Sequence, residues 1–196
     1  MKNLIKKCTL LIVLFLTITV SGKSNFDDFR ISTLNSNTLN FQLSNSDGNS
    51  DVKIYDEEGI LLYQEAILGS IFSKKFNFNL LPDGKYKIEV VGQTRITTFP
   101  FKIENATIKV FENDKSVVYK PIVWAKDDLL YISKFLGNEK EAISMALYDN
   151  DVTLYQIKPR LMKSFEKTLD IRNLPKGNYK LVVNYGDRSL VTTIKK

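Results

Sequence analysis

The sequence predicts an all-β protein in which a signal peptide precedes two similar β-sandwiches. Three observations support this prediction. Apolar and polar residues alternate with a period of two in several short runs, which is typical of half-buried strands. Turn-forming clusters of Gly, Pro, Asn and Asp separate these runs at short intervals. Finally, a long segment of the first half recurs in the second half, so the chain contains an internal repeat.

The N-terminal 22 residues have the order of a secretory signal peptide. Three lysines and no acid occur in the first seven residues, the apolar run Thr9–Val20 follows, and the small residues Ser21 and Gly22 end it. The run is shorter than the roughly 20 residues that a membrane-spanning helix needs. We therefore expect cleavage between Ser21 and Ser24, export of the mature chain and no transmembrane anchor.

The composition excludes several kinds of site. The sequence contains no His and a single Cys, Cys8, which precedes the apolar run and would leave with the signal peptide. A lipoprotein signal places its Cys after the run, so Cys8 argues against lipid attachment. Without thiol or imidazole, the mature chain cannot form a disulfide, a Ser-His-Asp or Cys-His centre, or a zinc site built on His or Cys. We expect a non-enzymatic protein with no cofactor and no metal.

Charge is distributed unevenly along the chain. The net charge is +6, and removal of the three lysines of the signal peptide leaves +3, which is too small to predict a nucleic-acid partner. Residues 106–196 carry 16 basic and 11 acidic side chains, whereas residues 23–105 carry 9 and 11. The basic second half either favours an anionic surface, such as a membrane or an acidic glycan, or is a solvated Lys-rich face that keeps edge strands apart.

The internal repeat divides the mature chain. Residues 52–103 match residues 145–195 at an offset near 93, and one-residue gaps in the alignment fall in turns, where sandwiches tolerate them. We expect two domains, 23–105 and 106–196, that meet near Glu104-Asn105. No Pro/Gly/Ser linker separates them, which favours a fairly fixed relation between the two.

Each half supplies about the seven strands of a small immunoglobulin-like sandwich. In the first half, strands are predicted at 30–34 and 38–44. In the second half, they are predicted at 117–123 and 129–135, and Pro121 marks the former as an edge strand because it cannot donate to a ladder. Alternation predicts further strand positions at Leu39, Phe41 and Leu43; Phe76, Phe78 and Leu80; Tyr86, Ile88 and Val90; Leu169 and Ile171; and Tyr179, Leu181 and Val183.

Two short motifs occur once in each copy. The first is Tyr-Asp at the start of an acidic turn, and the second is Leu-Pro-x-Gly-x-Tyr. In the second motif, Pro fixes the turn, Gly takes a backbone angle that other residues avoid, and the Tyr hydroxyl can bond back to the preceding corner. We assign these structural roles to Tyr55, Asp56, Pro82, Gly84, Tyr86, Tyr148, Asp149, Pro175, Gly177 and Tyr179.

At these motifs the sequence resembles the immunoglobulin-like C-terminal sorting domains of the type IX secretion system in Bacteroidetes-type bacteria. It is also similar to small secreted proteins of that phylum, flavobacterial in style, that consist of two such repeats. The resemblance covers most of the mature chain, and the basic ending Val191–Lys196 is similar to the finish of a sorting domain. It implies an immunoglobulin-like fold and an envelope address, and it implies no chemistry.

Four residues are candidates for a binding surface: Trp124, Lys158, Arg160 and Lys163. Trp124 is the only Trp of the chain. It either contacts a sugar or a partner, or lies in the core as a lone Trp in a sandwich often does. Residues 157–162 are predicted to form a basic loop between strands, and loops at the ends of sandwiches commonly bind ligands.

Three acidic segments have alternative interpretations. The segment 47–51 is either a calcium-binding loop or a plain polar hairpin loop. The turns 56–58 and 149–151 either pair carboxylates for glycan hydrolysis or form turns and nothing more. Their alignment with each other favours turns, since the duplication of one turn explains both.

These observations predict an exported binding or structural module that is not an enzyme. Its partner is expected to be a cell-envelope protein or a glycan, contacted through end loops or through an edge strand to which an extended peptide adds. The alternative is a sorting-type domain that the type IX secretion machinery recognises. Both predictions place the protein in the periplasm, at the cell surface or in the medium.

Overall fold

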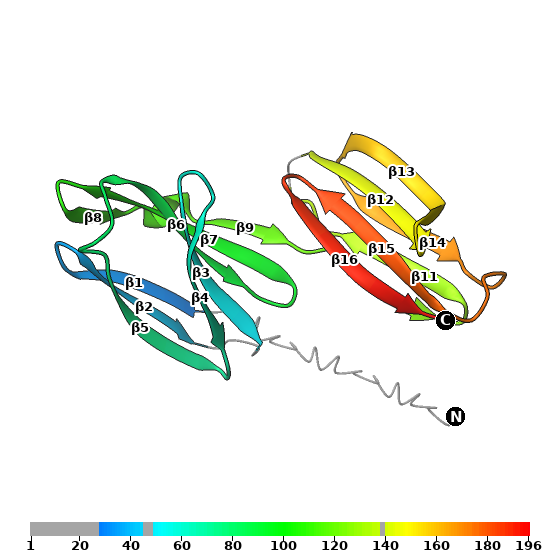
Figure 1. The fold of residues 1–196 in the computed structure, drawn as a ribbon, viewed down its shortest axis with the longest axis horizontal. Helices are drawn as coiled ribbons and strands as arrows, with labels where there is room; N and C mark the ends of the chain where they lie inside the picture. The colour runs from blue at the N-terminus through cyan, green and yellow to red at the C-terminus, as the bar shows by residue number, and fades with distance from the viewer. Residues whose placement is uncertain (1–27, 45–48, 138–139) are drawn as a thin grey trace, which may run out of the picture.

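A computed structural model describes residues 28–44, 49–137 and 140–196 of the chain. Within these residues the protein is all-β, with sixteen strands in four antiparallel sheets (Figure 1). The predicted signal peptide and part of the segment 47–51 lie outside the described residues. No helix in the described ranges is long and apolar enough to cross a membrane.

The first sandwich packs a three-stranded sheet, β1-β2-β5, against a larger sheet, β4-β3-β6-β7-β8, in which β9 also pairs with β7. The strands are β1 (Asp28–Asn35), β2 (Thr38–Ser44), β3 (Ser50–Asp56), β4 (Leu61–Ile67), β5 (Ile71–Asn77), β6 (Gly84–Val91), β7 (Arg95–Glu104), β8 (Thr107–Val110) and β9 (Ser116–Tyr119). A 3-10 turn at Glu112–Asp114 separates β8 from β9.

The second sandwich packs a three-stranded sheet, β10-β11-β14, against a four-stranded sheet, β13-β12-β15-β16. Its strands are β10 (Ile122–Lys126), β11 (Leu129–Lys134), β12 (Glu141–Asp149), β13 (Val152–Met162), β14 (Phe165–Asp170), β15 (Asn178–Tyr185) and β16 (Arg188–Lys195). In Figure 1 the two sandwiches lie along the long axis of the molecule, and β9 leads from one toward the other.

The period-two alternation places one face of each inner strand in a core. Leu39, Phe41 and Leu43 of β2 are at most 1% exposed, and they pack on the facing residues of the larger sheet. Aromatic rings fill much of this first core, and Phe101 stacks between Phe78 and Tyr86 at 5.1 and 5.4 Å. Burial of such large apolar surfaces is the main source of stability for a chain without disulfides.

The second sandwich has its own core of mostly aliphatic residues. Leu130 and Ile132 of β11 face Met145 of β12 and Leu181 and Val183 of β15, and all five are at most 1% exposed. The residues of this cluster do not overlap with those of the first core. Each half of the chain therefore buries apolar surface around a separate centre.

The corner tyrosine occupies the same place in both sandwiches. The hydroxyl of Tyr86 donates to the carbonyl oxygen of Pro82 at 2.8 Å, and the hydroxyl of Tyr179 donates to that of Pro175 at 2.7 Å. Both rings are buried. Each bond therefore ties the start of a core strand to the turn that precedes it.

The expectation for the glycines of this motif was wrong. Neither Gly84 nor Gly177 has a positive φ, because the Pro already sets the turn and the chain then enters the strand with ordinary backbone angles. An added Cβ would meet the ring of Tyr86 at 3.6 Å from Gly84 and that of Tyr179 at 3.9 Å from Gly177, both ordinary contacts.

Two predicted strand positions also need correction. Strand β5 ends at Asn77, and the chain then turns, with the Leu81 N–H bonded to the Phe78 carbonyl at 3.0 Å. Leu80 is therefore 97% exposed rather than in the core. The predicted strand 117–123 is two strands, because the chain leaves β9 before Pro121 and enters β10 after it.

The two sandwiches are joined by paired backbone. Strands β8 and β9 follow the expected division at residue 105, yet both pair with β7, and Ile108 belongs to the first core. Val118 of β9 pairs with Ile96 of β7 and also packs on the second core. The connection is thus part of both hydrophobic assemblies.

A buried ion pair spans the same junction. Arg188, at the start of β16, donates two hydrogen bonds to the Glu89 carboxylate of β6, at 2.8 and 3.3 Å. Lys87 lies 3.1 Å from the same carboxylate, whose side chain is 3% exposed. Burial, the largest effect, raises the pKa of Glu89, but together the bonds from Arg188 and Lys87 outweigh it and hold the pKa below its usual range.

Candidate functional site

The second sandwich is open along one side, where the edge strands of its two sheets face each other. Strand β13 is the edge of the four-stranded sheet, β14 is the edge of the three-stranded sheet, and a short turn at residues 163–164 joins them. A groove of about 470 Å³ lies between these strands, which we call the β13–β14 groove. It is lined by Tyr155, Ile157, Arg160, Met162, Ser164, Phe165, Glu166 and Lys167.

A β-bulge directs Arg160 into this groove. In the pairing of β12 with β13, Met145 faces Ile157 and Ile143 faces Arg160, so Lys158 and Pro159 together face a single residue. The extra residue shifts the alternation, and Arg160 points to the same side as Ile157. Pro159 fits here because it needs no ladder partner at a bulge on an edge strand.

This arrangement corrects the prediction for residues 157–162. They continue strand β13 and are not a loop. The alternation of apolar and polar residues is interrupted at Lys158 and Pro159, and this interruption is the bulge itself. Strand β13 is eleven residues long and, among the described residues, pairs only with β12, so its other edge presents backbone groups without a described partner.

The groove concentrates positive charge. The Nζ of Lys167 lies 5.3 Å from the centre of the Tyr155 ring, and Arg160 lines the same space. Among the described residues, no carboxylate lies within ion-pair distance of either cation. Glu166 also borders the groove, but its side chain is exposed and forms no ion pair with them. Arg160 and Lys167 thus line one groove, and neither forms an ion pair with a described carboxylate, so the groove is suited to an anion.

The equivalent place in the first sandwich is occupied by a carboxylate of the chain. Glu65 of β4 lies 2.5 Å from the Nζ of Lys74 of β5 and also accepts a hydrogen bond from the Tyr63 hydroxyl. Lys74 lies over the Tyr63 ring at 4.9 Å. The hydrogen bonds from Lys74 and Tyr63 lower the pKa of Glu65. The charge of Lys74 is therefore compensated within the sandwich.

The repeat alignment relates these two places residue by residue. Tyr63 corresponds to Tyr155 and Lys74 to Lys167, and both pairs have the same cation–π arrangement. Glu65, however, corresponds to Ile157. The second copy has kept the aromatic ring and the cation and has lost the carboxylate.

A smaller apolar pocket recurs beside this place in both copies. The pocket of the first sandwich has a volume of about 200 Å³ and is lined by Ile54, Leu62, Tyr63, Phe76, Asn77, Phe78, Leu80 and Leu81. That of the second has about 320 Å³ and is lined by Leu147, Leu154, Tyr155, Thr168, Leu169, Asp170, Ile171 and Leu174. Tyr155 borders both this pocket and the β13–β14 groove, so an apolar recess adjoins the cationic one.

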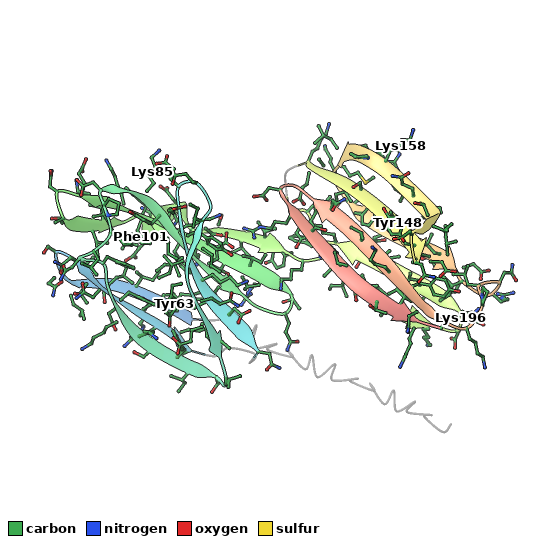
Figure 2. All side chains as sticks on the ribbon, viewed as in Figure 1. Tyr63, Lys85, Phe101, Tyr148, Lys158 and Lys196 are labelled. Carbon is green, nitrogen blue, oxygen red and sulfur yellow. The ribbon has the colours of Figure 1, made fainter. Side chains whose placement is uncertain are left out.

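The structure brings together only part of the predicted binding surface. Arg160 lines the groove, and Lys158 lies on the same strand but outside the groove lining (Figure 2). Lys163 lies in the turn between β13 and β14. Trp124 lies on β10, which β11 separates from β14. Trp124 is therefore not part of the groove.

Trp124 is not a core residue either. It is 47% exposed and stacks on Tyr131 of the neighbouring strand, with ring centres 5.2 Å apart and planes at 9°. The alternative that Trp124 lies in the core is wrong. Its side chain is on the outward face of β10, together with that of its register partner Tyr131. Lys167 was not among the predicted binding residues, although the repeat alignment already set Ile157 against Glu65.

Several other charged groups near cavities are paired within the chain. At a cavity of about 240 Å³ between β9 and the end of β11, the buried amine of Lys134 lies 2.5 Å from Glu141. In the acidic turn 56–58, Glu57 pairs with Lys85 at 2.8 Å. Asp56 accepts the N–H of Ile60 at 2.7 Å, which is ordinary turn chemistry. Within the described residues, no group of three or more acidic, His or Cys side chains is placed to hold a metal.

Comparisons with known proteins give structural likenesses but no family. No protein-family model and no curated protein matches the chain. A solved structure described as "Biofilm associated protein - BSP domain" is similar over 86% of this chain, with 11% identity and a TM-score of 0.26. The match covers 29% of that structure's chain, so this protein spans less than a third of its length. A likeness at this TM-score assigns neither a family nor a function.

Proposed function

We propose that this protein is an exported, non-enzymatic binding or structural module of the cell envelope, built from two sandwich domains, and that it engages a partner through strand β13. The observation that carries the proposal is the long free edge of β13 beside the β13–β14 groove. An extended partner segment can add to such an edge through main-chain hydrogen bonds, while adjacent pockets select its side chains.

The surroundings of the acidic side chains support a non-enzymatic role. Among the described residues, Glu57, Glu65, Glu89, Glu104 and Glu141 each form an ion pair with a Lys or Arg. For Glu65, Glu89 and Glu104, the hydrogen bonds from their basic partners hold the carboxyl pKa below its usual range, whereas a general acid needs a raised pKa. These side chains serve the structure.

Photo-crosslinking in the native host tests the proposed contact. Replacing Gln156, an exposed residue of β13, with benzoylphenylalanine is expected to give discrete adducts with an envelope protein. The matched control is Val191 on β16, which is 61% exposed on the opposite edge of the same sheet. Adducts of equal yield from both positions, or none from Gln156, would contradict the proposal.

Cell fractionation tests the address and the sorting alternative. An internally tagged protein is compared with a version that lacks residues 145–196. Retention of the shorter protein in the periplasm, with the full-length protein outside the cell, would assign the second copy an export role. If both remain in the same envelope fraction, and Gln156 of the full-length chain gives adducts where Val191 does not, the binding-module proposal is supported.

A further inference from the structure

We propose that the β13–β14 groove binds an extended acidic segment of a partner protein, with a partner carboxylate between Tyr155, Arg160 and Lys167. The inference rests on the proposed function and adds to it the chemical class of the partner. The comparison of the two copies of the repeat within one chain carries it.

The first sandwich shows which group satisfies this arrangement of side chains. There, the aromatic ring of Tyr63 and the amine of Lys74 enclose the carboxylate of Glu65. The second sandwich keeps the ring and the amine in the same geometry, and Ile157 takes the position of the acid. Among the described residues no carboxylate completes this set of contacts at Lys167, so a carboxylate of a partner would complete it.

The second copy has also gained a cation at this place. The bulge at Lys158 and Pro159 turns Arg160 to the side of β13 that lines the groove, which Lys167 of β14 also lines. A guanidinium presents a planar set of donors that matches a carboxylate, and it gives a stronger and more directional bond than an amine. The groove therefore favours a carboxylate over a neutral amide of the same shape.

The free edge of β13 indicates that the carboxylate belongs to an extended polypeptide. Its backbone can add alongside β13, so that alternate side chains face the groove. The apolar recess next to Tyr155 takes a neighbouring apolar side chain. A segment that alternates apolar and acidic residues satisfies both features.

Fluorescence anisotropy of the intact mature protein tests the proposal. The probe is a labelled ten-residue peptide that alternates valine with glutamate, and its twin carries glutamine in place of every glutamate. The glutamate peptide is expected to bind at least about tenfold more tightly, and this preference should shrink as salt is raised. Equal affinity of the two peptides would overturn the proposal.

Variants locate the binding. Ile157→Glu restores the acid of the first copy, so its carboxylate should neutralise Lys167 and remove the preference for the glutamate peptide. Arg160→Gln should weaken binding about tenfold, which corresponds to the loss of one charge-assisted bond. The matched control is Lys158→Gln, which removes a cation from the same strand outside the groove and should change the affinity less than about twofold.

Each alternative outcome is distinguishable. If Ile157→Glu unfolds the second sandwich, Arg160→Gln carries the test, because the Arg160 side chain is exposed. If the two peptides bind equally while Gln156 still forms adducts, the acidic partner is wrong and the edge-strand proposal stands. If Arg160→Gln instead dissociates an oligomer of the protein in gel filtration and the peptides do not bind, the groove is an interface between copies and the proposal is overturned.

Discussion

At the scale of single residues, Tyr86 and Tyr179 show a side chain whose role follows from its motif. Each ring lies in a core while its hydroxyl reaches a backbone carbonyl four residues earlier. The ring supplies apolar burial, and the hydroxyl satisfies an acceptor at a corner where no strand partner is available.

Removing the corner hydroxyls is expected to destabilise each sandwich. Tyr86→Phe and Tyr179→Phe should each lower the free energy of unfolding by about 1–2 kcal/mol, because each leaves a carbonyl without its donor. Urea denaturation followed by circular dichroism measures the effect. Tyr148→Phe is the control, since the Tyr148 hydroxyl makes no hydrogen bond within the described residues, and an equal loss there would contradict the explanation.

Trp124 gives a second prediction at this scale. It stacks on Tyr131 at the surface, so Trp124→Ala should lower the free energy of unfolding by about 1 kcal/mol or less, whereas a buried Trp would cost roughly 3–5 kcal/mol. Acrylamide should quench the fluorescence of the single Trp in the folded protein. Strong protection from acrylamide would place Trp124 against an unforeseen surface.

At the scale of elements, strand β13 combines a free edge, which a partner strand can pair with, and features that discourage random edge-to-edge pairing. Lys158 and Pro159 interrupt its free edge at the bulge, and charges, prolines and bulges are the means by which proteins discourage edge-to-edge aggregation. The groove side of the same strand carries Arg160 and Tyr155.

Replacing the proline should therefore promote self-association. Pro159→Val restores a backbone donor and a strand-forming side chain at the edge, so static light scattering should show faster aggregation on mild heating. The corresponding change on a paired part of the protein, Pro100→Val in β7, serves as the control because β7 is covered on both sides. Similar aggregation of both variants would show that the edge at Pro159 is not special.

The sequence predicted the inner strands better than the edges. Leu39, Phe41 and Leu43 alternate strictly with polar residues because β2 has a strand on each side and packs one of its faces on the core. Strand β13 was partly mistaken for a loop because its bulge breaks the alternation, and Leu80 was mistaken for a core residue because period-two spacing continues past the end of β5. Arg160 could be selected from the sequence, whereas its approach to Lys167 depends on tertiary pairing.

At the scale of the whole molecule, the junction depends on residues that no local pattern identifies. Glu89 lies on the outward phase of β6, between the inward Ile88 and Val90, where alternation predicts a solvated side chain. It is buried because Arg188, 99 residues further on, pairs with it from the second sandwich. The sequence predicted a fairly fixed relation between the two halves, and this ion pair supplies a physical basis for it.

The junction is expected to open in acid. The pKa of Glu89 is lower in the folded protein than in the unfolded chain. The ion pair of Glu89 therefore stabilises the junction fully above the ordinary carboxyl pKa of about 4.3, and this stabilisation is lost as the pH falls through the pKa of Glu89 in the folded protein. Small-angle X-ray scattering should show a radius of gyration that increases as the pH is lowered progressively below the ordinary carboxyl pKa.

Substitutions test whether the ion pair of Glu89 causes this opening in acid. Glu89→Gln should weaken the junction by about 3 kcal/mol at neutral pH, because Arg188 loses the carboxylate that accepts its two hydrogen bonds and keeps the more distant Asp187, at 3.8 Å, as a counter-charge. The control is Glu104→Gln. Glu104 is also paired with two lysines, which lower its pKa to about 2, but it lies at the surface and away from the junction. A change in the radius of gyration with Glu104→Gln, or none with Glu89→Gln, would contradict this account.

The pairing of β8 and β9 with β7 decides how the gene can be divided to produce the first sandwich alone. A recombinant fragment that stops at residue 105, where the repeat ends, would lack Ile108 of the core and leave one side of β7 uncovered. A fragment that continues through Lys120 keeps Ile108 in the core and keeps the strands that cover this side of β7. The N–H of Lys120 bonds to the Thr94 carbonyl at 2.8 Å. We therefore expect the longer fragment to be the smallest one that folds on its own, so that the repeat in the sequence and the unit that can be expressed have different ends.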